Sequence, residues 1–270
     1  MPELPEVETT RRGLAAYVVG RTIARVEVRE PRLRWPVARR LPQALAGARI
    51  GTLERRAKYL LFGTDAGTLL VHLGMSGSLR YLPTPVELAA HDHIDVHFDG
   101  GGALRFNDPR RFGSFMLTAT PSKHPLLKDL GPEPLGDEFD ADYLWRSSRN
   151  RRVTIKQHVM NGRVVVGVGN IYASEALFRA GIHPKRMAGR IARARFEPLV
   201  TAVRDVLRDA IEEGGTTLRN FVGGDGQPGY FSGSLRVYDR EGSPCVNCGT
   251  AIERRVLGQR ATFYCPRCQR

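Results

Sequence analysis

Residues 245–268 read CVNCGTAIERRVLGQRATFYCPRC, in which two Cys-x-x-Cys pairs are separated by 16 residues. Each pair can form a tight turn that points two thiolates at one metal, and the paired spacing is typical of a structural zinc site. Four thiolates leave no open coordination position, so such a metal holds shape and does no chemistry. Two disulfides or two redox motifs are the alternative reading. We expect one structural Zn²⁺ bound by Cys245, Cys248, Cys265 and Cys268.

The segment around this motif, residues 235–270, is expected to fold as short strands into a β-hairpin zinc finger. About 35 residues are too few to enclose a core, so metal binding must supply the stability of the segment. The segment carries seven arginines and three acids, a net charge of 7 − 3 = +4. A positively charged hairpin of this kind is suited to face a nucleic acid.

The whole chain is strongly basic. Its 41 basic and 28 acidic residues give a net charge of +13. An excess of this size on a folded chain predicts a polyanionic partner, because neutralised phosphates release their counterions. A solvated basic surface is the alternative, and biased codon usage could explain why only five of the basic residues are Lys. We expect nucleic acid as the partner.

Length and hydrophobicity limit the class of protein. The chain has 270 residues, which suits two small domains, and 41% of them are hydrophobic, enough for real cores. No apolar run approaches the roughly 18 residues of a membrane span. The start, with prolines and glutamates, fits no secretory signal. We therefore expect a soluble, cytoplasmic protein without membrane association.

The hydrophobic period changes along the chain. Residues 2–20 predict one helix, since apolar side chains recur at helical spacing and Gly20 is a plausible stop. From about residue 22 to 118 the period is two, and glycines separate the runs, which predicts a β-sandwich or barrel. The clearest strand candidates are Ile23–Val28, Thr68–Leu73, Ile94–Phe98 and Ala103–Phe106.

The second half of the chain follows a helical pattern. Residues 119–141 are rich in Pro, Gly and Asp, as a linker would be. Residues 199–211 carry a clean apolar stripe that Gly214-Gly215 ends. Residues 218–230 form a Gly-rich loop, and loops of this length are often functional.

Together these patterns predict an α+β multidomain protein. An N-terminal helix and β-sandwich are followed by a helical domain and the C-terminal β-hairpin zinc finger. We expect a catalytic β-sandwich domain over residues 1–130, a linker over 131–145, a helical DNA-binding domain with its loop over 146–230, and the zinc finger over 235–270.

The N-terminus offers an unusual nucleophile. Met1 precedes a small residue, and its removal would expose the secondary amine of Pro2. A terminal amine has a reference pKa near 7.7–8.0, so a useful fraction is unprotonated at neutral pH. Its adduct with a sugar aldehyde is a cationic iminium, and the neighbouring Glu3 and Glu6 could relay protons. An ordinary Pro/Glu-rich helix start is the alternative.

The chain resembles bacterial formamidopyrimidine-DNA glycosylases, the MutM family, over essentially its whole length. Met-Pro-Glu-Leu-Pro-Glu-Val-Glu-Thr at residues 1–9 carries the resemblance at the start. Further motifs follow in family order: residues 56–60 (RAKYL), 72–77 (HLGMSG), 108–113 (DPRRFG), 167–175 (GVGNIYASE) and 259–265 (QRATFYC), the last entering the four-cysteine module.

The resemblance implies roles in catalysis. Pro2 would be the Schiff-base nucleophile, and Glu3 the acid/base that opens the sugar. Glu6 would be a supporting carboxylate. Lys58 would contact the phosphate at the lesion and assist proton transfer, and Arg260 would contact the lesion phosphates and assist the last elimination.

The resemblance also implies DNA contacts. Met75, Arg110 and Phe112 would enter the duplex where the base has left, and a turn between glycines favours exposure of Met75 over core packing. Asn170 would bind phosphate from a helix–two-turn–helix element, although an Asn at a helix start is usually a cap. His91 and Arg151 would be further DNA contacts. The 218–230 loop would close over the extruded base.

The implied activity is that of a bifunctional DNA glycosylase and apurinic/apyrimidinic lyase of base excision repair. The enzyme would bend damaged double-stranded DNA between its two halves, flip an oxidised purine such as 8-oxoguanine or a formamidopyrimidine, and complete β,δ-elimination. We expect a monomer, because one chain supplies both halves. The alternatives are an oxidised-pyrimidine glycosylase of the endonuclease VIII type and a non-catalytic zinc-ribbon DNA-binding protein.

Overall fold

A computed structural model describes residues 2–216 and 231–270. The chain divides into two compact units. Unit 1 comprises Met1–Lys128 and Glu213–Ser232, and unit 2 comprises Asp129–Glu212 and Gly233–Arg270. The chain thus returns to unit 1 after the helical segment, whereas the sequence pattern grouped residues 146–230 together.

Unit 1 begins with helix α1, Leu4–Val18, slightly shorter than the stretch from residue 2 to residue 20 that periodicity suggested. Pro5 lies in its first turn, where a missing backbone N–H costs nothing. Its apolar stripe, including Leu4, Val7 and Leu14, is buried. Beyond the helix, Gly20 has a φ of +86°, which a glycine adopts without strain.

Two antiparallel four-stranded sheets follow. The first has the order β2-β3-β4-β8 and the second the order β1-β6-β7-β5. The strands of the first sheet are β2 (Ile50–Arg56), β3 (Tyr59–Thr64), β4 (Gly67–His72) and β8 (Ser114–Thr118). Those of the second are β1 (Ile23–Val28), β5 (Ser78–Leu82), β6 (Asp92–Phe98) and β7 (Ala103–Asn107). Unit 1 also contains the short helices α2 (Leu41–Leu45) and η1 (Pro121–Lys123).

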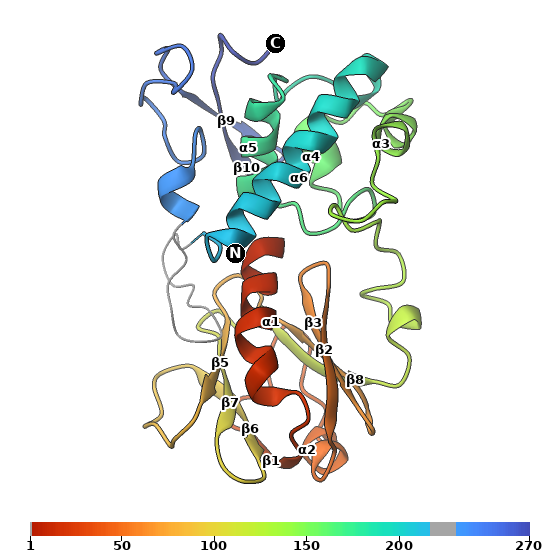
Figure 1. Ribbon diagram of the computed structural model, residues 1–270, viewed down its shortest axis with the longest axis vertical. Coiled ribbons are helices and arrows are strands. Elements are labelled where there is room, and N and C mark those ends of the chain that lie inside the picture. The colour runs from red at the N-terminus through yellow and green to blue at the C-terminus, as the bar shows by residue number, and fades with distance from the viewer. Residues whose placement is uncertain (1, 217–230) are drawn as a thin grey trace. The chain divides into compact units, whose positions relative to one another are not determined.

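The inner faces of the two sheets enclose one hydrophobic core, to which α1 contributes Val7, Leu14 and Val18. Alternation along the strands creates this core, because every second side chain of a strand points to the same face. Helix α1 runs along both sheets, against β2 and β3 of one and β5 of the other (Figure 1). The helix that carries the N-terminus is therefore fixed to the sandwich along its length.

Unit 2 is helical with a terminal hairpin. Its α-helices are α3 (Ala141–Ser148), α4 (Ile155–Val159), α5 (Asn170–Arg179) and α6 (Phe196–Glu212). The 3₁₀ turns are η2 (Ala188–Arg190), η3 (Arg193–Arg195) and η4 (Phe231–Ser234, whose first residues fall in unit 1), and the hairpin strands are β9 (Glu253–Leu257) and β10 (Arg260–Tyr264). Helix α3 starts inside the expected 131–145 linker, where Asp140 caps it by accepting a 2.6 Å hydrogen bond from the backbone N–H of Tyr143.

Helices α5 and α6 form the centre of unit 2 (Figure 1). The predicted apolar stripe of α6 is buried, and α5 packs against both α6 and strand β10. The predicted fold class, an N-terminal helix with a β-sandwich followed by helices and a terminal β-hairpin with four cysteines, is confirmed. Among the residues that the structure describes, no helix is long and apolar enough to cross a membrane.

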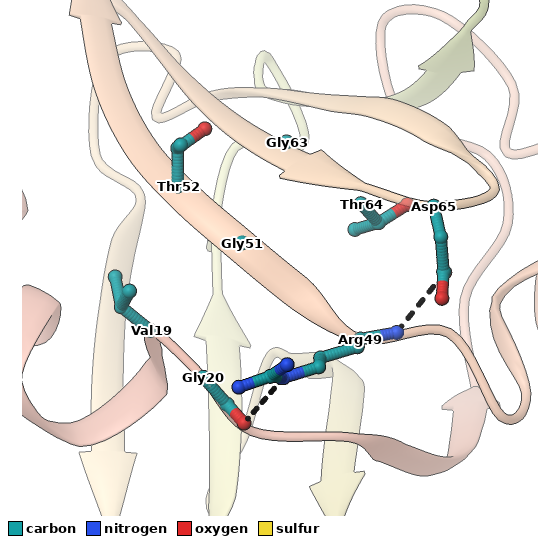
Figure 2. Close-up of a pocket in the computed structure, with 8 residues that line it drawn as sticks. All are labelled: Val19, Gly20, Arg49, Gly51, Thr52, Gly63, Thr64 and Asp65. Atoms are coloured by element: carbon teal, nitrogen blue, oxygen red, sulfur yellow. Dashed lines mark hydrogen bonds between the residues drawn. The ribbon is translucent and has the colours of Figure 1, made fainter.

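A surface pocket with a volume of about 680 Å³ lies at the far end of α1, lined by Val19, Gly20 and the β2–β3 hairpin (Figure 2). Arg49 borders it, its backbone N–H bonded to Asp65 and its side chain to the Gly20 carbonyl oxygen. Helix α1 has 15 residues, so its two ends are about 22 Å apart. The pocket is therefore remote from Pro2.

Candidate functional site

Pro2, Glu3 and Glu6 lie together at the start of α1, and all three are buried. The backbone N–H of Glu3 donates a 2.7 Å hydrogen bond to Oε2 of Glu6. This bond satisfies a donor that the first helical turn would otherwise leave unpaired, and it fixes the residue that follows the proposed nucleophile. Glu6 thus supports the geometry of Pro2 and Glu3 through the backbone.

The second oxygen of Glu6 anchors another part of unit 1. Its Oε1 accepts a 2.8 Å hydrogen bond from the backbone N–H of Thr216. The Gly215 carbonyl oxygen in turn accepts 3.1 Å from the N–H of Phe231. A Cβ at Gly215 would lie 3.2 Å from Cγ of Glu6, and its φ of +85° also favours glycine. Thr216 and Phe231 are therefore held beside the start of α1.

The Gly-rich stretch 218–230, expected to close over the extruded base, lies outside the described residues. The described residues that flank it, Thr216 and Phe231, are both buried.

An ion-pair relay connects α1 to the turn that carries Lys58. Glu8 pairs with Arg55 at 3.2 Å, and Nη1 of Arg55 donates 3.0 Å to the carbonyl oxygen of Ala57. Burial alone would raise the pKa of Glu8, but hydrogen bonds from Arg11 and Arg12 hold it below its ordinary value. The charged carboxylate keeps the helix and the turn in a fixed relation.

Lys58 occupies a two-residue turn between β2 and β3, with Ala57 at a φ of 55°. The strand after it pairs Tyr59 with His72 of β4, and their rings lie 4.7 Å apart. Burial, then the charges of Lys58 and Arg34, lower the pKa of His72 to about 4. Lys58 and His72 are therefore close enough to interact electrostatically.

His72 is a neutral hydrogen-bond donor at this site. The backbone N–H of Gly74 donates 3.0 Å to its Nδ1, so Nδ1 carries no proton and Nε2 carries the hydrogen. The same bond holds the start of the turn that presents Met75. A neutral imidazole next to a lysine ammonium offers two donors to one anion, such as a phosphate.

The loops that carry Met75 and Phe112 meet backbone to backbone. A Cβ at Gly74 would lie 2.5 Å from the backbone N of Gly113 and 2.6 Å from the carbonyl carbon of Phe112, so only glycine fits there. Met75 is half-buried in its turn. Phe112 is 38% exposed, a large exposed fraction for an aromatic side chain.

Arg110 lies over this aromatic side chain. Its guanidinium carbon is 4.6 Å from the centre of the Phe112 ring, a cation–π contact. Met75, Arg110 and Phe112, which the resemblance predicts to enter the duplex, therefore lie on two adjoining loops.

Buried Asp108 holds these two loops in place. Its Oδ2 accepts a 2.8 Å hydrogen bond from the N–H of Gly113, and its Oδ1 accepts a 3.0 Å hydrogen bond from the hydroxyl of Ser76. Its own N–H donates 3.1 Å to the carbonyl oxygen of His91, an exposed residue at a φ of 71°. One carboxylate thus joins two loops that are distant from each other in the chain.

In unit 2, Asn170 is the first residue of α5 and Gly169 is the N-cap. The Asn170 side chain does not cap the helix: its Nδ2 donates 3.0 Å to the carbonyl oxygen of Ala261 on β10. An amide nitrogen carries two hydrogens, so a second donor is left for an anion. The buried Oδ1 has no hydrogen-bond partner among the described residues.

Lys156 ties α4 to the same strand. Its side chain is almost fully buried, and Nζ donates 3.0 Å to the carbonyl oxygen of Ala261 and 2.8 Å to the hydroxyl of Thr262. Ala261 therefore receives both Lys156 and Asn170, directly after Arg260. Charge-assisted bonds of this kind are stronger than neutral ones and fix the register of β10.

Arg260 is exposed and begins β10, directly after a two-residue turn of Gly258 and Gln259. Both turn residues have positive φ, 54° and 61°, the geometry of a tight hairpin turn. The tip rests on α4, because a Cβ at Gly258 would lie 2.6 Å from Nε2 of Gln157. Helix α4 thus supports the hairpin that presents Arg260.

The four cysteines form one cluster whose sulfur atoms all lie within 4.8 Å of one another. Cys245 and Cys268 are 3.9 Å apart, and Cys248 and Cys265 are 3.5 Å apart, as Sγ–Sγ distances. Tetrahedral zinc with Zn–S bonds of about 2.3 Å requires sulfur separations of about 3.8 Å. The predicted site therefore fits one structural Zn²⁺, which would hold the hairpin in shape.

The four thiols share their protons unequally. Hydrogen bonds from Thr250 lower the pKa of Cys248 to about 6. A hydrogen bond with Cys248, followed by burial, raises the pKa of Cys268 to about 12. Four thiolates this close repel one another without a cation, and a bound Zn²⁺ offsets that repulsion.

Sequence reasoning missed three positioning residues. His72 and Asp108 fall inside quoted motifs but had no assigned role. Glu175, also inside a motif, is fully buried and accepts three backbone N–H groups, from Arg236 at 3.0 Å, Val237 at 2.9 Å and Tyr238 at 2.8 Å. The signal available was a charged or titratable residue embedded in an otherwise buried stretch, since such groups are rarely buried without partners.

Three family models match the chain in order. The formamidopyrimidine-DNA glycosylase N-terminal domain matches residues 1–115, the H2TH domain of the same glycosylase matches residues 130–222, and the zinc finger found in FPG and IleRS matches residues 242–270. The resemblance noted from motifs is therefore confirmed by models that cover most of the chain.

Curated relatives match from end to end. The formamidopyrimidine-DNA glycosylase of Thioalkalivibrio sulfidiphilus is 59% identical over 271 residues, and that of Stutzerimonas stutzeri is 56% identical over 270 residues. Both alignments cover 100% of each chain.

Solved structures share the fold. MutM (Fpg) of Thermus thermophilus has a TM-score of 0.89 at 41% identity, covering 99% of this chain and 98% of that one. The Lactococcus lactis Fpg mutant G226P, in complex with DNA containing Fapy-dG, has a TM-score of 0.92 at 33% identity, covering 100% of both chains. From its motifs, its four-cysteine cluster and these full-length matches, the chain belongs to the formamidopyrimidine-DNA glycosylase family.

Proposed function

We propose that the chain is a bifunctional DNA glycosylase and apurinic/apyrimidinic lyase that removes oxidised purines, including formamidopyrimidines and 8-oxoguanine, from double-stranded DNA. The single observation that carries this proposal is Pro2 at the start of α1, with Glu3 directly after it and Glu6 bonded to its backbone. Solved relatives hold DNA containing Fapy-dG or carbocyclic 8-oxo-G, which supports the substrate class.

Catalysis begins at the secondary amine of Pro2, once Met1 has been removed. The nitrogen attacks C1′ of the lesion sugar while the glycosidic bond breaks. The base leaves with the bonding electrons and takes up a proton, and the nitrogen loses the hydrogen that it carried. Glu3 gives a proton to the sugar ring oxygen, which opens the ring and leaves a cationic iminium between Pro2 and C1′. Glu6 keeps Glu3 in place through the 2.7 Å backbone bond.

Strand cleavage follows from the iminium. This cation acidifies C2′, and loss of a C2′ proton expels the 3′ phosphate by β-elimination; a second elimination expels the 5′ phosphate. The result is a one-nucleotide gap with phosphates at both ends. Lys58 and Arg260 would bind the phosphates and assist these proton transfers, as expected for cationic side chains.

Phosphate recognition in unit 1 would use Lys58 together with the Nε2 hydrogen of neutral His72. In unit 2 it would use the second N–H of the Asn170 amide and the exposed Arg151. Four thiolates hold the structural Zn²⁺ that keeps the Arg260 hairpin folded.

Base extrusion would use the side chains of the adjoining 74–77 and 108–113 loops. A nucleotide leaves the stack at a cost of a few kcal/mol, which a protein offsets by filling the gap. Met75 and Phe112 are half-buried and partly exposed apolar side chains, and Arg110 carries donors for the orphaned partner base. His91 would contact DNA beside them. The protein would act on DNA as a monomer in the cytoplasm.

The decisive test traps the iminium. The protein is incubated with a duplex that carries 8-oxoguanine opposite cytosine, in the presence of borohydride, and the covalent complex is counted on a denaturing gel. Pro2→Gly is expected to lose the complex, whereas Pro5→Ala, which alters the same helix start and keeps the nucleophile, is expected to retain it. Mass spectrometry first establishes that Met1 is absent.

Three outcomes would contradict the proposal. No trapped complex with the unsubstituted protein would favour a non-catalytic DNA-binding protein. Trapping that survives Pro2→Gly and maps to a lysine would remove Pro2 as the nucleophile. Faster processing of an oxidised pyrimidine than of 8-oxoguanine in matched duplexes would assign the chain to the endonuclease VIII type of specificity.

A further inference from the structure

Two basic segments of unit 2 lie side by side. The chain before α4 and the chain around η2 are joined by backbone hydrogen bonds: Gly189 N–H to the carbonyl oxygen of Arg151 at 3.1 Å, Ala188 N–H to that of Val153 at 3.0 Å, and Ile155 N–H to that of Arg186 at 2.7 Å. Thr154 and Met187 also form an antiparallel bridge. The two segments therefore form one continuous surface.

This surface carries five exposed basic side chains, which we call the η2 patch: Arg151, Arg152, Lys185, Arg186 and Arg190. No member has a carboxylate partner in the described part of the chain. Among the described residues, one hydrogen bond involves a side chain of the patch: Arg151 donates a long bond, 3.4 Å, to a backbone carbonyl oxygen. The patch is thus a cluster of positive charge without compensation.

Several other exposed arginines of unit 2 have an acidic partner. Arg193 pairs with Asp142 at 2.6 Å, Arg208 faces Asp205 at 3.7 Å, and Arg255 contacts Glu253 at 3.4 Å. A merely solvated basic surface would carry acids among its arginines as these regions do, because interspersed signs avoid self-repulsion. No ion pair in the described residues involves the η2 patch, and five cations gathered on one surface are complementary to an anionic partner.

The charges of the η2 patch also act on a neighbouring group. His183 lies two residues before Lys185, and its pKa is lowered by burial first and then by Lys185 and Arg186, with Glu253 acting in the opposite direction. Two apolar side chains, Val153 at 44% exposure and Met187 at 42%, lie among the charges. Each segment thus sets one apolar side chain beside two cations, which suits contact with both the phosphates and the sugars of a nucleic-acid strand.

We propose that the η2 patch binds the phosphate backbone of duplex DNA outside the lesion nucleotide, with Lys185, Arg186 and Arg190 extending the contact expected of Arg151. The inference rests on the proposed function, since it assigns the patch to the same DNA. Its role is to strengthen sequence-independent binding during the search for damage, because phosphate contacts position a protein without reading bases.

The test measures binding to undamaged 30-base-pair duplex as a function of salt. The slope of log K against log salt is negative. We expect it to become shallower by about 0.9 in each of three variants: Lys185→Ser, Arg186→Ser and Arg190→Ser. The affinity difference from the unsubstituted protein should then shrink about threefold between roughly 50 and 200 mM salt. Arg208→Ser removes the same charge from α6 of the same unit and is expected to keep the full slope.

The results separate this inference from the proposed function. Unchanged affinity and slope in all three patch variants, with thermal unfolding like that of Arg208→Ser, would overturn the assignment of the patch to DNA. An equal loss of DNA affinity and salt slope in Arg208→Ser would mean that binding depends on net charge and not on the patch. Failure of the borohydride trap in the unsubstituted protein would contradict the enzyme proposal, while the salt slopes with undamaged DNA would still decide the role of the patch.

Discussion

Units 1 and 2 position functional side chains by different means. Unit 1 rests on a hydrophobic sandwich that encloses its own core, and polar ties such as Asp108 and Glu6 adjust the loops on top of it. The hairpin of unit 2 has only a small core, built by Phe178, Val237, Ile252, Phe263 and two of the cysteines. The difference teaches that unit 1 is held together by its own apolar core, whereas the hairpin depends on a metal and a few buried charges.

Zinc removal should give the largest difference in stability between the two units. Structural zinc contributes about 10–16 kcal/mol of apparent binding free energy, far more than the hairpin core can supply. Chelation, or Cys265→Ser, is expected to unfold residues 235–270 and weaken lesion binding by roughly 100-fold or more. Calorimetry should still show the transition of unit 1 at its original temperature. Loss of both transitions together would show that the units are not independent.

The buried carboxylate of Glu175 gives the next largest effect. It accepts three backbone N–H groups, and a glutamine would turn an NH₂ group toward at least one of these donors. Glu175→Gln is expected to destabilise unit 2 by about 3 kcal/mol, measured by urea unfolding. The exposed Glu212→Gln on α6 serves as the control and should change stability by less than about 0.5 kcal/mol. Equal effects would remove Glu175 as the anchor of the segment before the hairpin.

Asp108 is the counterpart in unit 1, and its effect should be smaller because the sandwich core remains. Asp108→Asn loses one of two acceptor contacts, to Ser76 or to Gly113, and is expected to destabilise unit 1 by about 2 kcal/mol. It should also slow trapping, since the Met75 and Phe112 loops lose their tie. The exposed Asp99→Asn should do neither. A variant with normal stability and slow trapping would indicate that Asp108 takes part in chemistry.

The loss of stability in acid should give the smallest effect, and each unit contains one histidine that reports on it. Burial lowers the pKa of His72 in unit 1 and of His158 in unit 2 from 6.5 to about 4, aided by nearby cationic side chains. Below about pH 6.5 the unfolded chain takes up protons that the folded chain refuses, so stability falls as the pH drops from about 6.5 to about 4.

Variants that do not titrate measure these contributions. His72→Asn keeps an acceptor for the Gly74 N–H, and His158→Gln keeps a partner for the Ser147 hydroxyl, which lies 3.0 Å from Nε2 of His158. Each is expected to flatten the fall in melting temperature between about pH 7 and pH 5 for its own unit. An unchanged pH dependence in both would mean that other groups control acid unfolding.

Sequence patterns predicted the elements that are encoded by neighbouring residues in the chain. Helix α1, strand β1 and the buried stripe of α6 follow directly from periodicity, and the zinc site follows from the spacing of four cysteines. The β2–β3 hairpin had no such signal, because its turn uses Ala57 at positive φ where glycine or asparagine is usual.

The site was foreseen only where motifs named a residue. Pro2, Glu3 and Lys58 follow from the resemblance, but nothing in the local sequence shows that Asp108 joins two loops or that Lys156 reaches Ala261, 105 positions away. Such roles depend on contacts between segments that become neighbours only when the sheets and helices have packed. Nor does the sequence show that the basic segments at 151–152 and 185–190 are joined into one surface.

The shared anchor at Glu6 has a consequence for how this protein can change. One carboxylate bonds the backbone of Glu3, next to the proposed nucleophile, and that of Thr216, which precedes residues 217–230. Phe231, which follows them, is bonded to Gly215. With both flanking residues fixed on one support, residues can be added to or removed from the intervening stretch at little entropic penalty. The length and composition of that stretch can therefore vary while Pro2 and Glu3 keep their positions.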